Sequence, residues 1–201
     1  MKLLLSISCF IFLCQSVSSQ DWKIEKNKEG VVIETRFLDG WAVKQYRATV
    51  YIHSTLDNVV EAYRSADKRK QYMTRSVEVS NLEIRSKNEI VTYNHGDAPW
   101  PVSDRDNITL SVFSQPDANT ILVTMQSLPD FIPQKKGVVR VNRSEGFWEF
   151  TDMGDGRVRV IQQSVADIGG AVPDWVVNST IVEGPFEIFR TMKKVIEGTK
   201  G

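Results

Sequence analysis

The sequence predicts an α+β protein in which a curved antiparallel sheet of about eight or nine strands packs against one long C-terminal helix. Segments with alternating apolar residues follow one another through the middle of the chain, and turn-forming residues separate them. After Asp167 the pattern changes, and apolar residues recur at helical spacing. Because a sheet that buries one face needs a cover, we expect this helix to lie on the sheet.

The early chain predicts a hairpin, with strands Val31–Phe37 and Trp41–His53 around the turn Leu38-Asp39-Gly40. Ser54 and Asp57 are typical of a helix start, and we expect two short helices between the third and fourth strands. The later strands are expected at Val77–Arg85, Glu89–Asn94, Arg105–Phe113, Ile121–Met125, Val138–Val141, Gly146–Phe150 and Arg157–Ala166.

The last helix is expected to run from Pro173 to Glu197. Pro173 suits a first helical turn because its missing N–H would be unbonded there. Inside the run, Gly184-Pro185 is unfavourable, by roughly 3 kcal/mol for the proline alone, and predicts a kink. The apolar face comprises Trp175, Ile181, Val182, Ile188, Phe189, Met192, Val195 and Ile196, with Asn178 as its polar exception.

The first 19 residues resemble a secretory signal peptide. Met1-Lys2 supplies a positive start, Leu3–Leu13 is almost wholly apolar, and Val17 and Ser19 are small residues at the expected cleavage site. We therefore expect one domain over residues 20–201, exported to a periplasm or to the extracellular space. No second apolar run of membrane-spanning length follows.

Composition excludes several classes of function. Both cysteines, Cys9 and Cys14, lie in the predicted signal peptide, so the mature domain has neither a disulfide nor a thiol nucleophile. Lys and Arg together number 25 and balance 25 Asp and Glu, which gives no basis for nucleic-acid binding. The cluster Lys68-Arg69-Lys70 is interpreted as a solvated helix end.

Catalytic and metal-binding motifs are missing. The two histidines, His53 and His95, form no ligand cluster with cysteine. No G-x-S-x-G motif and no phosphate-binding loop occurs in the sequence. We accordingly expect no metal, no cofactor and no catalytic residue.

Two segments together resemble the START domain family, the lipid-transfer proteins related to the steroidogenic acute regulatory protein. The first runs from Tyr93 to Asp106 and contains Pro99-Trp100-Pro101 and Arg105. The second runs from Asp167 to Asn178 and contains Gly169-Gly170, Pro173 and Trp175. Gly184-Pro185-Phe186 is similar to the break in the last helix of the phosphatidylcholine-transfer branch. The resemblance covers essentially the whole predicted mature chain.

The resemblance implies a helix-grip fold, in which the sheet grips the last helix around a tunnel for one hydrophobic molecule. It also implies that Arg105 turns into this tunnel. Alternation along the strand leaves the question open, because Ile108 and Leu110 form the apolar set and Arg105 belongs to the other set with Asn107. Either a bulge separates them, or Arg105 points outward and pairs with Asp104 or Asp106.

The resemblance further implies a mobile gate at residues 97–104, where Pro99 and Pro101 flank Trp100, which could reach lipid or membrane. Gly184 and Pro185 form the predicted hinge. Tyr93 is a candidate for contacting a polar head group or for ordinary core packing. Asn178 and Ile181 face either ligand or sheet. The candidates for the far end of the tunnel, which equally suit a filled core, are Phe186, Phe189 and Met192.

The predicted function is that of an exported, monomeric carrier that binds one lipid or sterol-like molecule without transforming it and contacts membranes transiently. Burial of apolar ligand surface, at about 25 cal/mol per Å², would drive binding. Two alternatives stay open. A helix-grip enzyme of the cyclase or hydrolase kind would need a carboxylate, Tyr93 or His95 pointing inward beside Arg105. A protein with a filled core would act through its surface.

Overall fold

The computed structural model of the protein describes residues 21–98, 100, 102–170, 172–173, 177–178 and 181–198. The predicted signal peptide lies outside the described residues, as do Pro99, Pro101 and Trp175. Of the described helices, none has the length and apolar character that a membrane span requires.

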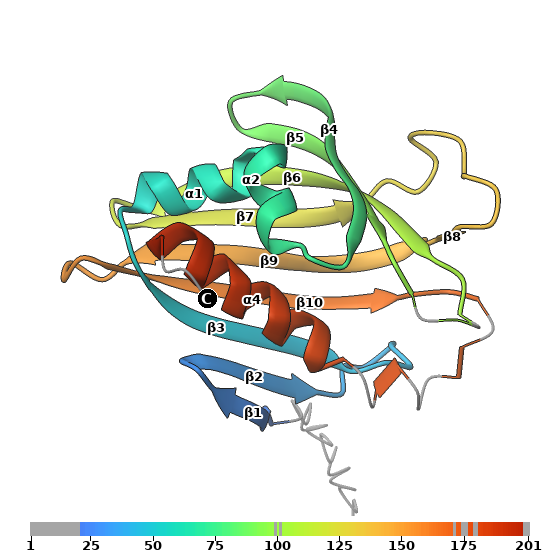
Figure 1. The fold of residues 1–201 in the computed structure, drawn as a ribbon, viewed down its shortest axis with the longest axis horizontal. Helices are drawn as coiled ribbons and strands as arrows, with labels where there is room; N and C mark the ends of the chain where they lie inside the picture. The colour runs from blue at the N-terminus through green and yellow to red at the C-terminus, as the bar shows by residue number, and fades with distance from the viewer. Residues whose placement is uncertain are drawn as a thin grey trace, which may run out of the picture.

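The described chain forms a ten-stranded sheet with helices on one of its faces (Figure 1), which confirms the predicted α+β class. The sheet order is β1-β2-β3-β10-β9-β7-β6-β5-β4, and the short β8 pairs with β6 in parallel, the one departure from an antiparallel arrangement. The strands are β1 (Lys23–Lys28), β2 (Val31–Arg36), β3 (Gln45–His53), β4 (Ser76–Ser86), β5 (Glu89–Gly96), β6 (Arg105–Asp117), β7 (Thr120–Ser127), β8 (Val139–Arg140), β9 (Arg143–Asp152) and β10 (Arg157–Asp167).

Two short helices connect β3 to β4, as the sequence predicts. They are α1 (Leu56–Arg64) and α2 (Ala66–Tyr72). The side chain of Thr55, rather than that of Ser54, caps α1 by accepting a hydrogen bond from the backbone N–H of Asn58. Ser65 ends α1 and caps α2 in turn, so the chain bends sharply between the two helices.

The first strand of the sheet, β1, was not predicted. Its sequence, Lys-Ile-Glu-Lys-Asn-Lys, lacks apolar alternation because β1 is an edge strand whose side chains are largely exposed or half-buried. It pairs with β2, whose residues Val31 and Ile33 are fully buried.

The prediction of one helix from Pro173 with a kink in its middle is wrong. The final helix, α4, spans Glu183–Glu197, and Gly184 and Pro185 lie in its first turn. A proline is tolerated there because the first N–H groups of a helix have no intrahelical acceptor. The chain before α4 retains helical contacts, with hydrogen bonds from Val177 N to Pro173 O and from Ile181 N to Val177 O.

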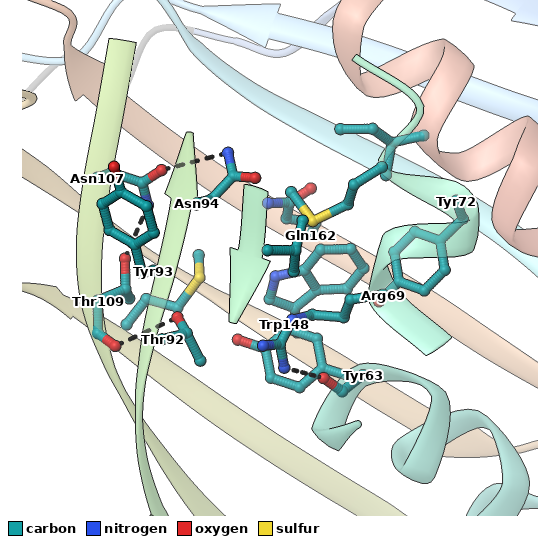
Figure 2. Close-up of a pocket in the computed structure, with 14 residues that line it drawn as sticks. Tyr63, Arg69, Tyr72, Thr92, Tyr93, Asn94, Asn107, Thr109, Trp148 and Gln162 are labelled. Atoms are coloured by element: carbon teal, nitrogen blue, oxygen red, sulfur yellow. Dashed lines mark hydrogen bonds between the residues drawn. The ribbon is translucent and has the colours of Figure 1, made fainter. Parts of the chain in front are cut away.

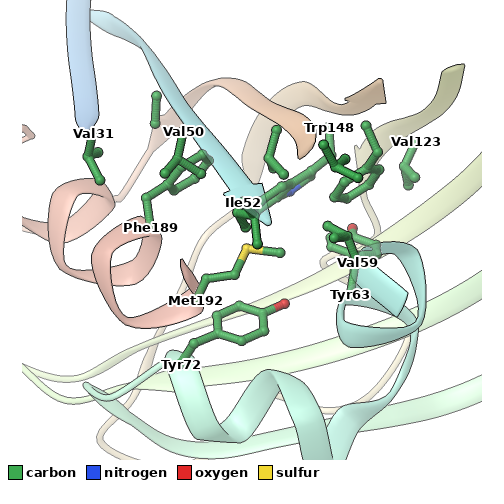
Figure 3. Close-up of a cluster of buried hydrophobic side chains, with 14 of the residues drawn as sticks. Val31, Val50, Ile52, Val59, Tyr63, Tyr72, Val123, Trp148, Phe189 and Met192 are labelled. Atoms are coloured by element: carbon green, nitrogen blue, oxygen red, sulfur yellow. The ribbon is translucent and has the colours of Figure 1, made fainter. Parts of the chain in front are cut away.

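The core lies between α4 and the centre of the sheet (Figure 3). Phe189 stacks on Trp148 of β9 at 5.3 Å between ring centroids, and Met192 is fully buried near Tyr72 of α2. Phe186 is buried in the same cluster. These three residues of α4 therefore pack against the sheet and α2, the alternative to tunnel lining that the sequence left open.

Strand β6 is covered on both faces. The polar side chains that alternate along β6 face the helices, where the Ser111 hydroxyl lies 2.9 Å from the Tyr63 hydroxyl. The apolar set of β6 faces the other side, where Ile108 packs with Val91 and Tyr93 beneath residues 128–138. No bulge between Arg105 and Ile108 is needed, since the register with β5 is regular from Arg105 to Val112.

Candidate functional site

A cavity of about 120 Å³ lies between the sheet and the helices (Figure 2). Strands β4, β5, β6, β7, β9 and β10 supply one part of its wall, and α1, α2 and α4 supply the rest. Its lining residues are Tyr63, Arg69, Tyr72, Met73, Val79, Thr92, Tyr93, Asn94, Asn107, Thr109, Met125, Trp148, Gln162 and Ile188.

One wall is apolar and aromatic. The ring of Tyr63 lies 5.3 Å from that of Trp148, and both belong to the buried core. Burial raises the pKa of Tyr63, and its hydroxyl is bonded to Ser111, so the phenol stays protonated at neutral pH. This wall can pack against hydrocarbon, since aromatic rings bury large apolar areas.

The facing wall carries a ladder of uncharged polar side chains on β5 and β6. Asn94 donates to Asn107 at 3.5 Å, and Asn107 donates to the hydroxyl of Thr109 at 3.0 Å. Thr92 donates to the carbonyl of Thr109 at 3.3 Å. Figure 2 shows these four side chains on one side of the pocket, with Trp148 across from them. We call Thr92, Asn94, Asn107 and Thr109 the amide–hydroxyl ladder.

The one cation among the described residues that line the cavity is Arg69 of α2, on the helix side, and it is only 5% exposed. Its guanidinium donates to Tyr63 O at 2.6 Å, to Asn81 Oδ1 at 2.6 Å and, over longer distances, to Arg64 O and Ser80 O. Burial lowers the pKa of Arg69. The interpretation of Lys68-Arg69-Lys70 as a solvated helix end is therefore wrong for Arg69, which ties α1 and α2 to β4.

A second pocket of about 170 Å³ adjoins the cavity. The two share Met73, Asn94 and Ile188 as lining residues. The second pocket extends to Asp97, at the start of the predicted gate, and to Gly184, in the first turn of α4.

Arg105 lies at one end of β6 and does not line the cavity. Its guanidinium donates to the carbonyl of Ser103 and, at 3.5 Å, to that of Gly169, while its Nε is buried without a partner among the described residues. A Cβ added at Gly170 would lie 3.2 Å from its Nη2, so this glycine leaves room for the arginine. Arg105 shares the inward-facing set of β6 with Asn107, and it is half-buried beneath the segment that leads to α4.

The acidic neighbours of Arg105 have other partners. Asp106, 1% exposed, accepts from Arg140 Nε at 2.6 Å and from the Tyr93 hydroxyl at 3.1 Å. Burial favours a higher pKa for Asp106, but the hydrogen bonds and charge of Arg140 outweigh it and leave the pKa lowered. Asp104 accepts from Ala98 N at 3.1 Å and lies 3.0 Å from His95 Nε2. The ion pair of Arg105 with Asp104 or Asp106, the alternative to a position in the tunnel, is not formed.

The other predicted site residues are placed apart from one another. Tyr93 borders the cavity, but its hydroxyl is engaged by Asp106 on the opposite face of the sheet. Trp100 is 93% exposed at the predicted gate. Asn178 Oδ1 accepts from Lys44 N at 2.7 Å, a contact that joins the segment before α4 to the chain ahead of β3. Ile181 is half-buried in the turn before α4.

Sequence reasoning missed most of the residues that line the cavity. The amide–hydroxyl ladder alternates along β5 and β6, and this was the available signal. On β6 this signal left open whether Arg105 and Asn107 point into a tunnel or outward, because a polar alternation normally marks an exposed face. Gln162 and Trp148 are directly opposite each other in the register of β10 and β9, which sequence could not reveal without the strand pairing.

The fold, with a cavity between the sheet and the helices, is that of a helix-grip protein. The model of the family described as START domain matches residues 12–199. An uncharacterized protein of Pseudomonas aeruginosa is 26% identical over 180 residues, which make up 89% of this chain and 88% of that protein. The phosphatidylcholine transfer protein of Rattus norvegicus is 22% identical over 188 residues, covering 90% of this chain and 86% of the relative.

A similar solved structure is that of a STAR-related lipid transfer protein from Xanthomonas axonopodis. It is 30% identical in sequence, with a TM-score of 0.81, over 87% of this chain and 98% of the other. The chain therefore belongs to the START domain family, and it is a lipid-binding domain.

Proposed function

We propose that this protein is an exported carrier that holds one lipid molecule between α4 and the sheet and releases it unchanged. The observation that carries the proposal is the cavity between the sheet and the helices, which has one aromatic wall and one uncharged polar wall. Such a site can bury an apolar chain while it orients a small polar group. The relatives whose names include lipid transfer or phosphatidylcholine transfer support the same class of ligand.

Access to the cavity requires movement. A volume of about 120 Å³ is well below the roughly 300 to 1,000 Å³ of common ligand sites. Displacing Met73 and Ile188 would join the cavity to the second pocket, which reaches Asp97 and Gly184. We therefore propose that lipid enters between residues 97–104 and the first turn of α4, with Gly184 and Pro185 as the hinge and Trp100 as the membrane contact.

The composition of the cavity wall favours binding over catalysis. Among the described residues that line it, none is a carboxylate or a histidine, the groups that most often act as general acids and bases. His95 and Asp104 pair with each other outside this lining. The cavity wall thus supplies groups that hold a ligand in place.

Native mass spectrometry of the purified protein tests the proposal. We expect the protein expressed in cells to carry a hydrophobic molecule at a stoichiometry of one. A Thr109→Phe variant would fill the cavity and should lose this molecule. Thr124→Phe is the matched control, because Thr124 is exposed on β7 and does not line the cavity. Protein that repeatedly lacks any bound molecule and takes up no fluorescent lipid from vesicles would refute the proposal.

A further inference from the structure

The cavity contains a buried acceptor that lacks a donor. Gln162 Oε1 is buried without a hydrogen-bond partner among the described residues. Gln162 lies in the middle of β10, lines the cavity, and is directly opposite Trp148 on β9 (Figure 2). Buried polar atoms almost always have a partner, so an unpaired acceptor in a ligand cavity is a position where a donor group of a ligand can bind.

Gln162 also has Tyr46 as a neighbour. Burial raises the pKa of Tyr46, so this phenol stays protonated at neutral pH. The surroundings of Gln162 on this side are therefore uncharged.

The rest of the polar wall is uncharged. The amide–hydroxyl ladder offers amide N–H groups, hydroxyls and carbonyl oxygens, and no member of it is ionisable. An anionic head group would add only acceptors, and these would face Gln162 Oε1 with the same sign of partial charge.

Arg69 of α2 is the cation on the helix side of the cavity, but its terminal nitrogens are already occupied. Nη1 donates to Tyr63 O and Arg64 O, and Nη2 donates to Ser80 O and Asn81 Oδ1. These four bonds use the four Nη hydrogens of the guanidinium. Arg69 thus holds the wall together and offers no Nη hydrogen to a ligand.

We propose that the cavity selects lipids whose polar group is an uncharged hydroxyl, and that this hydroxyl donates to Gln162 Oε1. This inference rests on the proposed lipid-binding function and specifies its ligand class. A hydroxyl supplies the donor that Gln162 Oε1 lacks, and it carries no charge into the cavity. Long-chain alcohols, sterols and diacylglycerols share this chemistry.

The test compares three probes with one identical pyrene-labelled alkyl chain that end in an alcohol, a methyl ether or a carboxylate. Binding is measured by fluorescence titration at pH 7.5, where the carboxylate is ionised. We expect the alcohol to bind at least about tenfold more tightly than either of the others, since the ether has no donor and the acid is an anion. An ether that binds as well as the alcohol, or a carboxylate that binds as well or better, would overturn the inference.

Two variants test whether Gln162 causes the preference for the alcohol. Gln162→Met should lower affinity for the alcohol about fivefold and leave affinity for the ether unchanged. Gln163→Met is the matched control, because Gln163 is the next residue of β10 and points to the opposite face of the sheet. Thermal unfolding is measured to check that both variants are folded.

Two further results would be decisive. If Gln162→Met keeps the full preference for the alcohol, the assignment to Gln162 is wrong, although the carrier proposal stands. If the folded wild-type protein binds none of the three probes, both the hydroxyl inference and the carrier proposal fail.

Discussion

At the scale of single residues, Gly146 shows how closely two strands approach. A Cβ added there would lie 2.2 Å from the carbonyl oxygen of Gln163 and 2.9 Å from Cα of Ser164, both backbone atoms that cannot rotate away. We expect Gly146→Ala to lower the free energy of unfolding by about 3 kcal/mol, measured by urea denaturation.

The control for this substitution is Gly184→Ala. A Cβ at Gly184 meets nothing within 4 Å, and the residue lies in the first turn of α4, so stability should change by less than about 1 kcal/mol. Equal effects of the two substitutions would show that the close approach of β9 and β10 is not what makes Gly146 necessary.

A second prediction for a single residue concerns Trp100. It is 93% exposed at the predicted gate, where an indole suits the interface between water and lipid head groups. Trp100→Ala should reduce co-sedimentation with phospholipid vesicles severalfold without changing the melting temperature. Ile84→Ala is the control, because Ile84 is also an exposed apolar residue, 71% exposed, near the end of β4. If both variants sediment like the wild type, Trp100 is not a membrane contact.

At the scale of elements, a buried ion pair fastens residues 128–138 to the sheet. Arg140 on β8 binds Asp106 on β6 and also donates to carbonyls of this segment, at Pro129 and at Ile132. Asp106→Asn keeps the shape of the side chain but leaves Arg140 without its anion. It should lower the free energy of unfolding by about 3 kcal/mol at pH 7.

This cost should depend on pH. The pKa of Asp106 in the folded protein is lowered from 3.8, so its contribution is complete at neutral pH and is lost as pH falls through the folded pKa. The difference in unfolding free energy between wild type and Asp106→Asn should therefore shrink toward pH 3. Asp155→Asn, which alters an exposed pair with Arg157, is the control and should change stability much less, because solvent screens exposed ion pairs. A difference that stays constant between pH 7 and pH 3 would contradict this role of Asp106.

The sequence predicted the elements better than it predicted the site. Strands β2 and β10 show apolar alternation, and their existence is confirmed. The last helix was predicted too long because apolar spacing continues through Ile181 and Val182, whereas the regular helix begins only at Glu183. The face of β6 could not be assigned, since residues 128–138 cover the side that alternation alone marks as the core. The burial of Arg69 depends on contacts with β4, which no local pattern reveals.

At the scale of the whole molecule, α1, α2 and α4 close one side of a cavity whose other side is the sheet. Each part alone is incomplete: α4 contributes Ile188, β6 contributes Asn107 and Thr109, and β10 contributes Gln162. The central claim is that a lipid occupies this space.

Photocrosslinking tests that claim most directly. A long-chain alcohol with a diazirine in its chain is bound to the protein and irradiated, and the labelled residues are identified by peptide mass spectrometry. We predict labels on residues that line the cavity, in β6, β9, β10 and α4, and their loss in Thr109→Phe but not in Thr124→Phe. Labels confined to exposed residues such as Trp100 and Ile84, and unchanged in Thr109→Phe, would contradict the claim.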